Sequence, residues 1–271
     1  MVDDDSPIDD IEIVADRADF LELLTERRLP KRAIVEELDR SRSTVNRAVS
    51  RLTAAGLVEE TPDGCRTTLV GRLALEEYRQ YVDRSADVLA ARKALSVLPT
   101  EADVPLQAVA GGEVYSAGGD RPYEPFERAY AVLEGSTTIR ACLRTVSNRR
   151  TLEVLLESAE QNRRVEIVFS ADLFRRLYSD WQDRIEALVD VDSFSGYVTD
   201  DPLPFAVLLS SRTDDETAPT TEVGIVTYTD DNELGGVIVN DVPAAVVWGR
   251  NQYRRCREAA RPFRAVLSGS R

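Results

Sequence analysis

Apolar and polar positions alternate with the period of an α-helix over the first part of the chain. The pattern predicts one helix within residues 11–28, a second over residues 30–39, and a third that begins near Ser43 and ends at Gly56. Each predicted helix has one apolar face, so the three should pack together around a small core. The residues expected in that core are Val14, Phe20, Leu21, Leu23, Leu24, Ile34, Val35, Leu38, Val45, Ala48, Val49 and Leu52.

The opposite face of the third predicted helix is polar and cationic. Arginine and asparagine can make bidentate contacts to guanine and adenine, so this face has side chains suited to the major groove of DNA. After Gly56, residues 57–60 and 65–70 have the pattern of two short strands around a Thr-Pro-Asp-Gly turn. The outward positions of the third helix are Ser43, Thr44, Asn46, Arg47, Ser50 and Arg51.

Residues 71–98 lack proline and internal glycine and are rich in alanine, leucine, arginine and glutamate, which predicts one long connecting helix. Leu75, Tyr78, Val82 and Leu89 form an apolar seam along it, at spacings of three, four and seven residues. DNA operators are usually two-fold symmetric because the proteins that bind them are dimers, so we assign this seam to a homodimer interface. The alternative is that the helix packs only on its own chain. Residues 99–105 have the composition of a linker.

Beyond Val104, apolar runs suited to strands alternate with amphipathic helical segments, a pattern typical of an α/β sheet covered by helices. Residues 138–169 have the order strand, helix, strand that makes a βαβ unit. The expected strands are 107–112, 138–146, 165–169, 205–210, 222–229 and 235–241, and the expected helices are 125–133, 149–161, 173–189 and 243–260.

Charge is distributed unevenly along the chain. The 271 residues carry a net charge of −14, and only Lys31 and Lys93 are lysine, a balance that resembles the proteins of salt-accumulating halophilic archaea. Residues 13–72, however, hold eleven basic and ten acidic side chains, a net of +1, which leaves −15 for the rest. The positive charges of this segment concentrate in Lys31, Arg32, Arg40, Arg42, Arg47 and Arg51, where DNA would have to touch the protein.

Several classes of protein are disfavoured by composition. No apolar run approaches the length of a membrane span, and the acidic first twelve residues are unlike a signal peptide, so we expect a cytoplasmic protein without a membrane partner. The three cysteines are far apart in sequence and form no CxxC pair, which predicts neither disulfides nor a metal site. Cys65, in the predicted hairpin, is a candidate for redox sensing, although a buried lone cysteine is usually inert. No cofactor is expected.

The segment from Ser41 to Glu60, SRSTVNRAVSRLTAAGLVEE, resembles the winged helix-turn-helix regulators of archaea and bacteria. The resemblance covers about 60 residues and implies that the third helix is a recognition helix and the hairpin a wing. It places Arg42, Ser43, Thr44, Asn46 and Arg47 near base edges and phosphates, Arg51 on the backbone and Arg66 at the wing. Lys31 and Arg32 complete the expected DNA-binding set. The competing interpretation is a winged helix that contacts another protein.

The second half resembles the C-terminal domains of TrmB-like and methanogenesis-regulator proteins of archaea, through residues 165–174 and 235–262. The resemblance implies a phospholipase-D-like fold used for sensing. Phospholipase-D chemistry needs histidine nucleophiles, and the chain contains no histidine; it also shows no GxSxG, P-loop or GxGxxG motif. We therefore expect no enzymatic activity, and the family's signal would be a small molecule or a stress.

A small-molecule effector, if there is one, should bind at the carboxyl ends of the parallel strands, where helix N-termini offer free N–H groups. The candidate contacts are Ser147, Asn148, Arg149, Ser170 and Asp172, although the two serines could simply cap helices. The chain is thus predicted to be an α/β multidomain regulator. It would comprise an acidic tail (1–12), a winged helix-turn-helix (13–70), a connecting helix (71–98) and a C-terminal α/β sensor domain (104–266), and would bind a double-stranded DNA operator as a homodimer.

Overall fold

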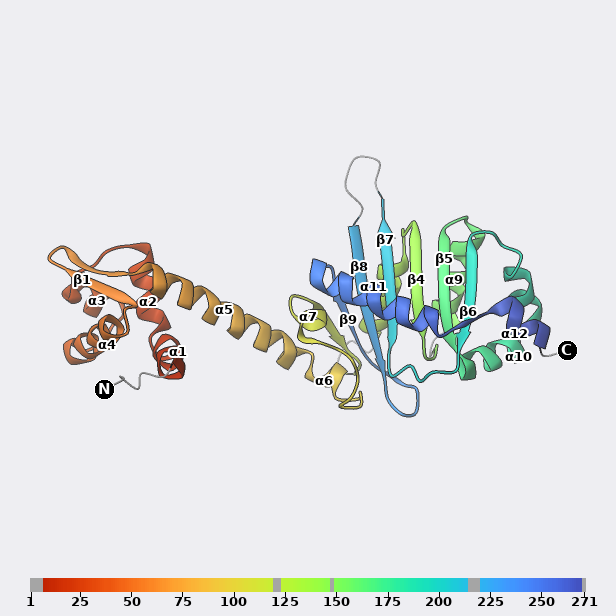
Figure 1. Ribbon diagram of the computed structural model, residues 1–271, viewed down its shortest axis with the longest axis horizontal. Coiled ribbons are helices and arrows are strands. Elements are labelled where there is room, and N and C mark those ends of the chain that lie inside the picture. Colours follow the sequence, from red (N-terminus) through yellow and green to blue (C-terminus); the bar gives the residue numbers. More distant parts are fainter. Residues whose placement is uncertain (1–6, 119–122, 147–148, 214–219, 270–271) are drawn as a thin grey trace. The chain divides into compact units, whose positions relative to one another are not determined.

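The computed structural model describes residues 7–118, 123–146, 149–213 and 220–269 (Figure 1). The chain divides into two compact units, residues 1–85 and 86–271, called here the N-terminal and C-terminal units. No helix among the described residues combines the length and the apolar character that crossing a membrane requires.

The described part of the N-terminal unit contains four helices and a hairpin, followed by the first part of a longer helix. These elements are α1 (Pro7–Asp16), α2 (Ala18–Glu26), α3 (Lys31–Glu37), α4 (Arg42–Ala54), β1 (Val58–Thr61), β2 (Gly64–Thr67) and the first part of α5 (Leu69–Ala90). The prediction of a single helix over residues 11–28 is wrong, because Arg17 has non-helical backbone angles and separates α1 from α2. The predicted acidic tail is helical from Pro7 onward.

The small core predicted for this unit is confirmed, with Phe20, Ile34 and Leu52 at most 1% exposed. Ser41 caps α4 by accepting a hydrogen bond from the Thr44 amide. Gly56 follows α4 with a φ of 69°, a conformation that glycine adopts without steric cost. The predicted hairpin is also confirmed, since β1 pairs antiparallel with β2.

The hairpin is attached to the helices by a short backbone pairing. Leu29 and Cys65 exchange two backbone hydrogen bonds of 3.0 and 2.8 Å, which fixes β2 against the loop between α2 and α3. A Cβ atom at Gly64 would lie 2.7 Å from the Leu29 carbonyl carbon, so this close approach requires glycine. The hairpin is therefore held at a defined position next to α3 and α4.

The C-terminal unit is a mixed α/β fold around one eight-stranded sheet. The strand order is β10-β6-β5-β4-β7-β8-β9-β3, in which β4, β5 and β6 run parallel and the other neighbours antiparallel. The strands are β3 (Glu113–Ser116), β4 (Thr138–Leu143), β5 (Arg164–Ser170), β6 (Phe194–Thr199), β7 (Ala206–Arg212), β8 (Thr220–Tyr228), β9 (Leu234–Asn240) and β10 (Arg261–Pro262).

Helices cover both faces of this sheet, and α11 crosses several strands on one of them (Figure 1). One core lies under α8 (Glu124–Leu133), α9 (Arg149–Glu160), α10 (Ala171–Leu188) and α12 (Phe263–Gly269). The other lies under α6 (Arg92–Leu95), α7 (Leu106–Val109) and α11 (Pro243–Glu258). The predicted βαβ unit is confirmed, because β4 and β5 are parallel and α9 joins them.

Three expectations for the region between residues 71 and 116 are wrong. The predicted strand over 107–112 is helix α7 to Val109, and the strand β3 begins only at Glu113. The long helix ends at Ala90, before the short helix α6, where Ala94 packs closely over Gly236 of the sheet. Residues 99–105 are not a free linker, since Asp103 accepts hydrogen bonds from Gln252 and Arg255.

The apolar seam assigned to dimerisation divides into two parts. Leu75 is 2% exposed and is therefore buried within its own unit, whereas Tyr78 is half-buried and packs against the same N-terminal core. For Leu75 the assignment is wrong, because the helix uses this side chain to close its own unit; for Tyr78 it stays a prediction. Val82 and Leu89 remain exposed, at 42% and 61%.

Candidate nucleic-acid interface and ligand cavity

The outward face of α4 carries the side chains that the sequence predicts for DNA contact. Asn46, Arg47 and Arg51 are exposed, while Val45 and Val49 on the opposite face are completely buried. The Arg47 side chain lies along the helix and donates a hydrogen bond of 3.4 Å to the Ser43 carbonyl. Ser43 is exposed, and Thr44 is half-buried beside the cap. The face is thus cationic, and its side chains can both donate and accept hydrogen bonds.

Charge compensation separates the predicted basic residues into two groups. Lys31 pairs with Glu60 at 2.7 Å and Arg66 pairs with Glu59, so the charges next to the hairpin are largely neutralised. By contrast, the structure shows no carboxylate partner, among the residues it describes, for Arg32, Arg42, Arg47 and Arg51. These four retain a net positive charge that a phosphate could neutralise.

Cys65 lies behind this surface, in β2. Its thiol is 1% exposed, and burial, followed by the charge of Glu60, raises the pKa of Cys65, with Lys31 opposing them. A raised pKa keeps the thiol protonated and poorly reactive. The geometry therefore gives no support to a redox role at this position.

A cavity of about 1080 Å³ in the C-terminal unit lies at the carboxyl ends of β5 and β6. Ser170 and Asp172, two of the five predicted effector contacts, line it. Ser170 donates to the Arg144 carbonyl at 2.7 Å and accepts from the Leu173 amide, so it caps α10 as well as facing the cavity. Ser147 and Asn148 lie outside the described residues, and Arg149 is the first residue of α9.

Most of the charged side chains around this cavity were missed by the sequence prediction. Arg144 donates to the Pro204 carbonyl at 3.3 Å and Arg176 to the Thr145 hydroxyl at 2.9 Å, so the two guanidinium groups are held in place by neutral oxygens. Acids and hydroxyls lie among them, which suits a ligand rich in hydroxyl groups better than a simple anion. The polar lining residues are Arg144, Ser170, Asp172, Arg175, Arg176, Thr199, Asp200, Asp201, Asp230 and Asn232.

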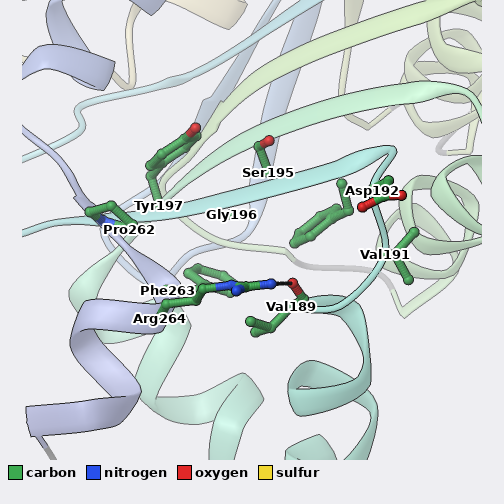
Figure 2. A pocket seen from close by; sticks show the side chains of 10 residues that line it. Val189, Val191, Asp192, Ser195, Gly196, Tyr197, Pro262, Phe263 and Arg264 are labelled. Carbon is green, nitrogen blue, oxygen red and sulfur yellow. Dashed lines mark hydrogen bonds between the residues drawn. The ribbon is translucent and has the colours of Figure 1, made fainter.

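A smaller cavity of about 250 Å³ lies between the end of α10, β6 and α12 (Figure 2). Its main cation, Arg264, donates to the Val189 carbonyl at 2.9 Å and lies 3.4 Å from the Asp190 carboxylate. The ring of Phe263 packs so closely on Gly196 that an added Cβ would approach it to 2.6 Å. Because these groups are already satisfied within the chain, we assign this cavity to packing.

Comparisons with known proteins agree with the division into two units. The family model for the middle domain of the methanogenesis regulatory protein FilR1 matches residues 122–259, and the model for the HVO_A0261 N-terminal domain matches residues 6–88. No individually curated protein sequence gives a significant match.

Similar solved structures include TrmBL2, described as an archaeal chromatin protein with a novel mode of DNA binding. It is 13% identical, with a TM-score of 0.41, over 94% of this chain and 99% of that one. NucT from Helicobacter pylori is 12% identical and gives a TM-score of 0.41 over 56% of this chain and 98% of that one. Nuc from Salmonella typhimurium, a phospholipase D family member, is 13% identical with a TM-score of 0.39 over the same shares, 56% and 98%.

Proposed function

The chain belongs to the family defined by the middle domain of the methanogenesis regulatory protein FilR1, and on that premise we propose that it is a transcription regulator that binds DNA sequence-specifically through α4. The observation that carries the proposal is the exposed face of α4, where Asn46 and Arg47 lie between arginines without carboxylate partners. Asparagine pairs with adenine and arginine with guanine in the major groove, and each such bidentate contact discriminates between bases.

The proposed arrangement is that of a winged helix-turn-helix. Helices α3 and α4 with the turn between them form the motif, α4 enters the major groove, and the hairpin β1–β2 is the wing beside it. Arg42 and Arg51, near the two ends of α4, contact phosphates, and Arg32 on α3 adds a further cation. Lys31 and Arg66 contribute less than their charge implies, since each is paired with a glutamate of the hairpin.

A salt titration of DNA binding separates this function from its competitor, in which the same helix contacts another protein. Each phosphate neutralised by the protein lowers the binding constant with a slope of about −0.9 in a plot of log K against log salt. Four arginines without a carboxylate partner in the described structure thus predict a slope no steeper than about −4 per protomer, or about −7 for a homodimer. A slope shallower than that of a lysine-rich regulator would let binding persist at high salt, which we expect for a chain of this acidic composition. Fluorescence anisotropy on an operator selected from random DNA measures it, and the absence of any selectable sequence would contradict the proposal.

We propose that the regulator acts as a homodimer through the exposed part of the α5 seam. Val82 and Leu89 lie on one side of the helix, whereas Leu69 and Leu73 lie on the roughly opposite side. Val82→Glu combined with Leu89→Glu should therefore give a monomer in analytical ultracentrifugation. Leu69→Glu combined with Leu73→Glu, at similarly exposed positions, is the matched control and should leave the dimer intact. A monomeric wild-type protein would contradict the assignment.

The large cavity at the carboxyl ends of β5 and β6 is the proposed place for an effector. Its mixture of carboxylates, hydroxyls and guanidinium groups favours a polyol, which can donate and accept at every hydroxyl. A panel of sugars and polyols tested by thermal shift should raise the unfolding temperature of the wild-type protein. Asp201→Asn should reduce that shift, whereas Asp183→Asn, a substitution on α10 at a residue that does not line the cavity, should leave it unchanged.

A further inference from the structure

Another cavity, of about 250 Å³, lies along one side of α11, between this helix and the strands β4 and β7. Four arginines line it: Arg250, Arg254 and Arg257 from α11, and Arg140 from β4. The positions 250, 254 and 257 are four and three residues apart, so these side chains project from one face of the helix. Buried Leu209 and Tyr253 form the floor between them. Four cations thus converge on one concave site in a chain with a large excess of acids.

The three arginines of α11 are positioned by neutral groups. Arg250 donates to the Thr221 hydroxyl at 3.3 Å, and Arg254 to the Asn251 amide oxygen at 3.4 Å. Within the described parts of the chain, neither they nor Arg257 forms an ion pair with a carboxylate. Their neighbour Arg255 projects elsewhere and pairs with Asp103. The mutual repulsion of the unpaired guanidinium groups is a cost that a bound anion would remove.

Arg257 is fixed by an aromatic ring. Its guanidinium group lies 3.4 Å from the centroid of the Tyr197 ring, the closest cation–π contact in the described structure. This contact orients the arginine without neutralising its charge, so its donors remain available to a ligand. The site is in this respect preorganised for an anion.

Glu166 supports the inner wall of the site and is the only carboxylate that contacts it in the described structure. It accepts a hydrogen bond of 3.0 Å from the Tyr253 hydroxyl and lies 3.5 Å from Arg140 and 2.8 Å from Arg164. The carboxylate is therefore shared among three donors and compensates only part of the charge of Arg140. The remaining charge of Arg140 faces the same cavity as the arginines of α11.

We propose that this site, called here the α11 arginine site, binds a compact small molecule that carries two or more phosphoryl groups. The α-carbons of Arg250 and Arg257 are about 10 Å apart along the helix, so a single phosphate would engage only part of the set. Arginine binds phosphate oxygens in a planar, bidentate geometry, and the apolar floor suits a sugar or similar ring between the phosphates. A DNA duplex is too wide to enter a cavity of about 250 Å³ and would leave Arg140 without a partner.

Isothermal titration calorimetry on the full-length protein tests the proposal with three probes: fructose 1,6-bisphosphate, inorganic phosphate and fructose. The bisphosphate should bind about tenfold or more tightly than phosphate, and any heat from fructose, which the larger cavity could bind, should be unchanged by Arg254→Gln. Arg254→Gln should weaken bisphosphate binding about tenfold or more, because it removes charge-assisted hydrogen bonds. Arg255→Gln, the same change at the next residue, removes only a surface ion pair and should change the affinity by less than about twofold.

Four results would overturn the assignment. An equal loss of bisphosphate affinity in Arg254→Gln and Arg255→Gln would indicate a general effect of charge. An absence of binding by both phosphorylated probes would leave the site without its ligand. A loss caused by Arg144→Gln but not by Arg254→Gln would place the ligand in the larger cavity instead. A loss of affinity for unrelated duplex DNA in Arg254→Gln would make the surface a nucleic-acid contact. The proposed DNA binding through α4 is tested independently, because Asn46→Ala changes that helix and leaves the α11 arginine site unaltered.

Discussion

Helices α4 and α11 both present exposed arginines for which the described part of the chain supplies no carboxylate partner, but the residues around those arginines differ. On α4 they alternate with serine, threonine and Asn46, which can donate to and accept from base edges. On α11 they stand above a floor of Leu209 and Tyr253, and Arg140 from the sheet joins them. A convex helix with mixed hydrogen-bonding groups suits the groove of DNA, whereas a concave all-arginine site suits a compact polyanion. The neighbours of a cation, more than its charge, determine which anion it can recognise.

The two helices also lie in different electrostatic surroundings. Residues 13–72 have a net charge of +1 and the remainder of the chain −15. Long-range attraction of DNA is therefore concentrated near α4, while the acidic surface of the C-terminal unit repels a large polyanion. A small ligand that enters the α11 arginine site meets the local positive charge at short range. The comparison predicts that changes in one helix leave the function of the other intact.

The largest expected effect comes from the buried side of α4. Leu52→Ala should lower the free energy of unfolding of the N-terminal unit by about 2–5 kcal/mol, since Leu52 is completely buried. Both tryptophans, Trp181 and Trp248, belong to the C-terminal unit, so tryptophan fluorescence follows that unit alone and circular dichroism follows both. The variant should shift the dichroism transition in urea and leave the fluorescence transition in place.

The matched control for this prediction is Leu156→Ala, at an equally buried position in the C-terminal unit. It should shift the fluorescence transition and leave operator binding measurable. If Leu52→Ala moved both transitions equally, the chain would unfold as one cooperative unit and the comparison between two independent regions would fail.

The next effect concerns the exposed side of α4. Asn46→Ala and Arg47→Ala should each weaken specific operator binding by about 1–3 kcal/mol, because each would remove a proposed bidentate base contact, while the fold is retained. Arg254→Gln is the control from the other helix and should leave operator affinity unchanged. Anisotropy titrations at one salt concentration measure all three. Unchanged affinity in both α4 variants would remove the recognition-helix assignment.

The cysteines offer a third contrast between the units. Cys65 and Cys142 are each 1% exposed, whereas Cys256 on α11 is half-buried. A hydrogen bond with Cys142 lowers the pKa of the Cys256 thiol and raises that of Cys142. Iodoacetamide should therefore modify Cys256 first, as followed by peptide mass spectrometry. Faster modification of Cys65 would restore the hairpin as the redox-sensitive region.

The smallest effect is a pH dependence confined to the C-terminal unit. Burial alone would raise the pKa of Glu166, but the hydrogen bond from Tyr253 and the charges of Arg140 and Arg164 outweigh it and lower the pKa. A lowered pKa in the folded state means that the ionised carboxylate stabilises the fold above the unfolded value of about 4.3, and that this contribution is lost as the pH falls through the folded value. On acidification, the free energy of unfolding measured by tryptophan fluorescence should therefore fall less in Glu166→Gln than in the wild-type protein. An equal fall in both proteins would contradict the attribution to Glu166.

Much of the N-terminal unit could be predicted from the sequence alone, because its elements are short and adjacent. The periodicity of Val45, Val49 and Leu52 defined the buried face of α4, and therefore its polar face as well. Gly56 and the Pro-Asp-Gly turn marked where the helix ends and the hairpin turns. The break at Arg17 was missed, since one residue with non-helical backbone angles leaves the spacing of the apolar residues along the chain unchanged.

The C-terminal unit shows the limit of this reasoning. Its βαβ unit and the helices α8, α9, α10 and α11 followed from local patterns, whereas α7 was predicted as a strand and α12 was missed. The strand β6 was also missed, because Ser195 and Gly196 interrupt its apolar character. The seam on α5 had the spacing of an interface, yet only the packed fold shows that Leu75 is used within the chain. Whether the apolar face of a helix is buried in its own chain or in an interface depends on what packs against it. The spacing of apolar residues in the sequence does not give that information.

The sequence by itself determined most of the longer elements and their order, the polar face of α4, the α/β class of the second half and the near-neutral charge of residues 13–72. Only the tertiary structure decided which arginines are compensated and which act together. Arg66 is neutralised by a glutamate on the paired strand, and Arg140 joins Arg254 and Arg257 across more than a hundred residues of sequence. The physical reason is that helix and strand periodicity follows from neighbours along the chain, whereas electrostatic interaction follows distance in space, which only the closed fold defines.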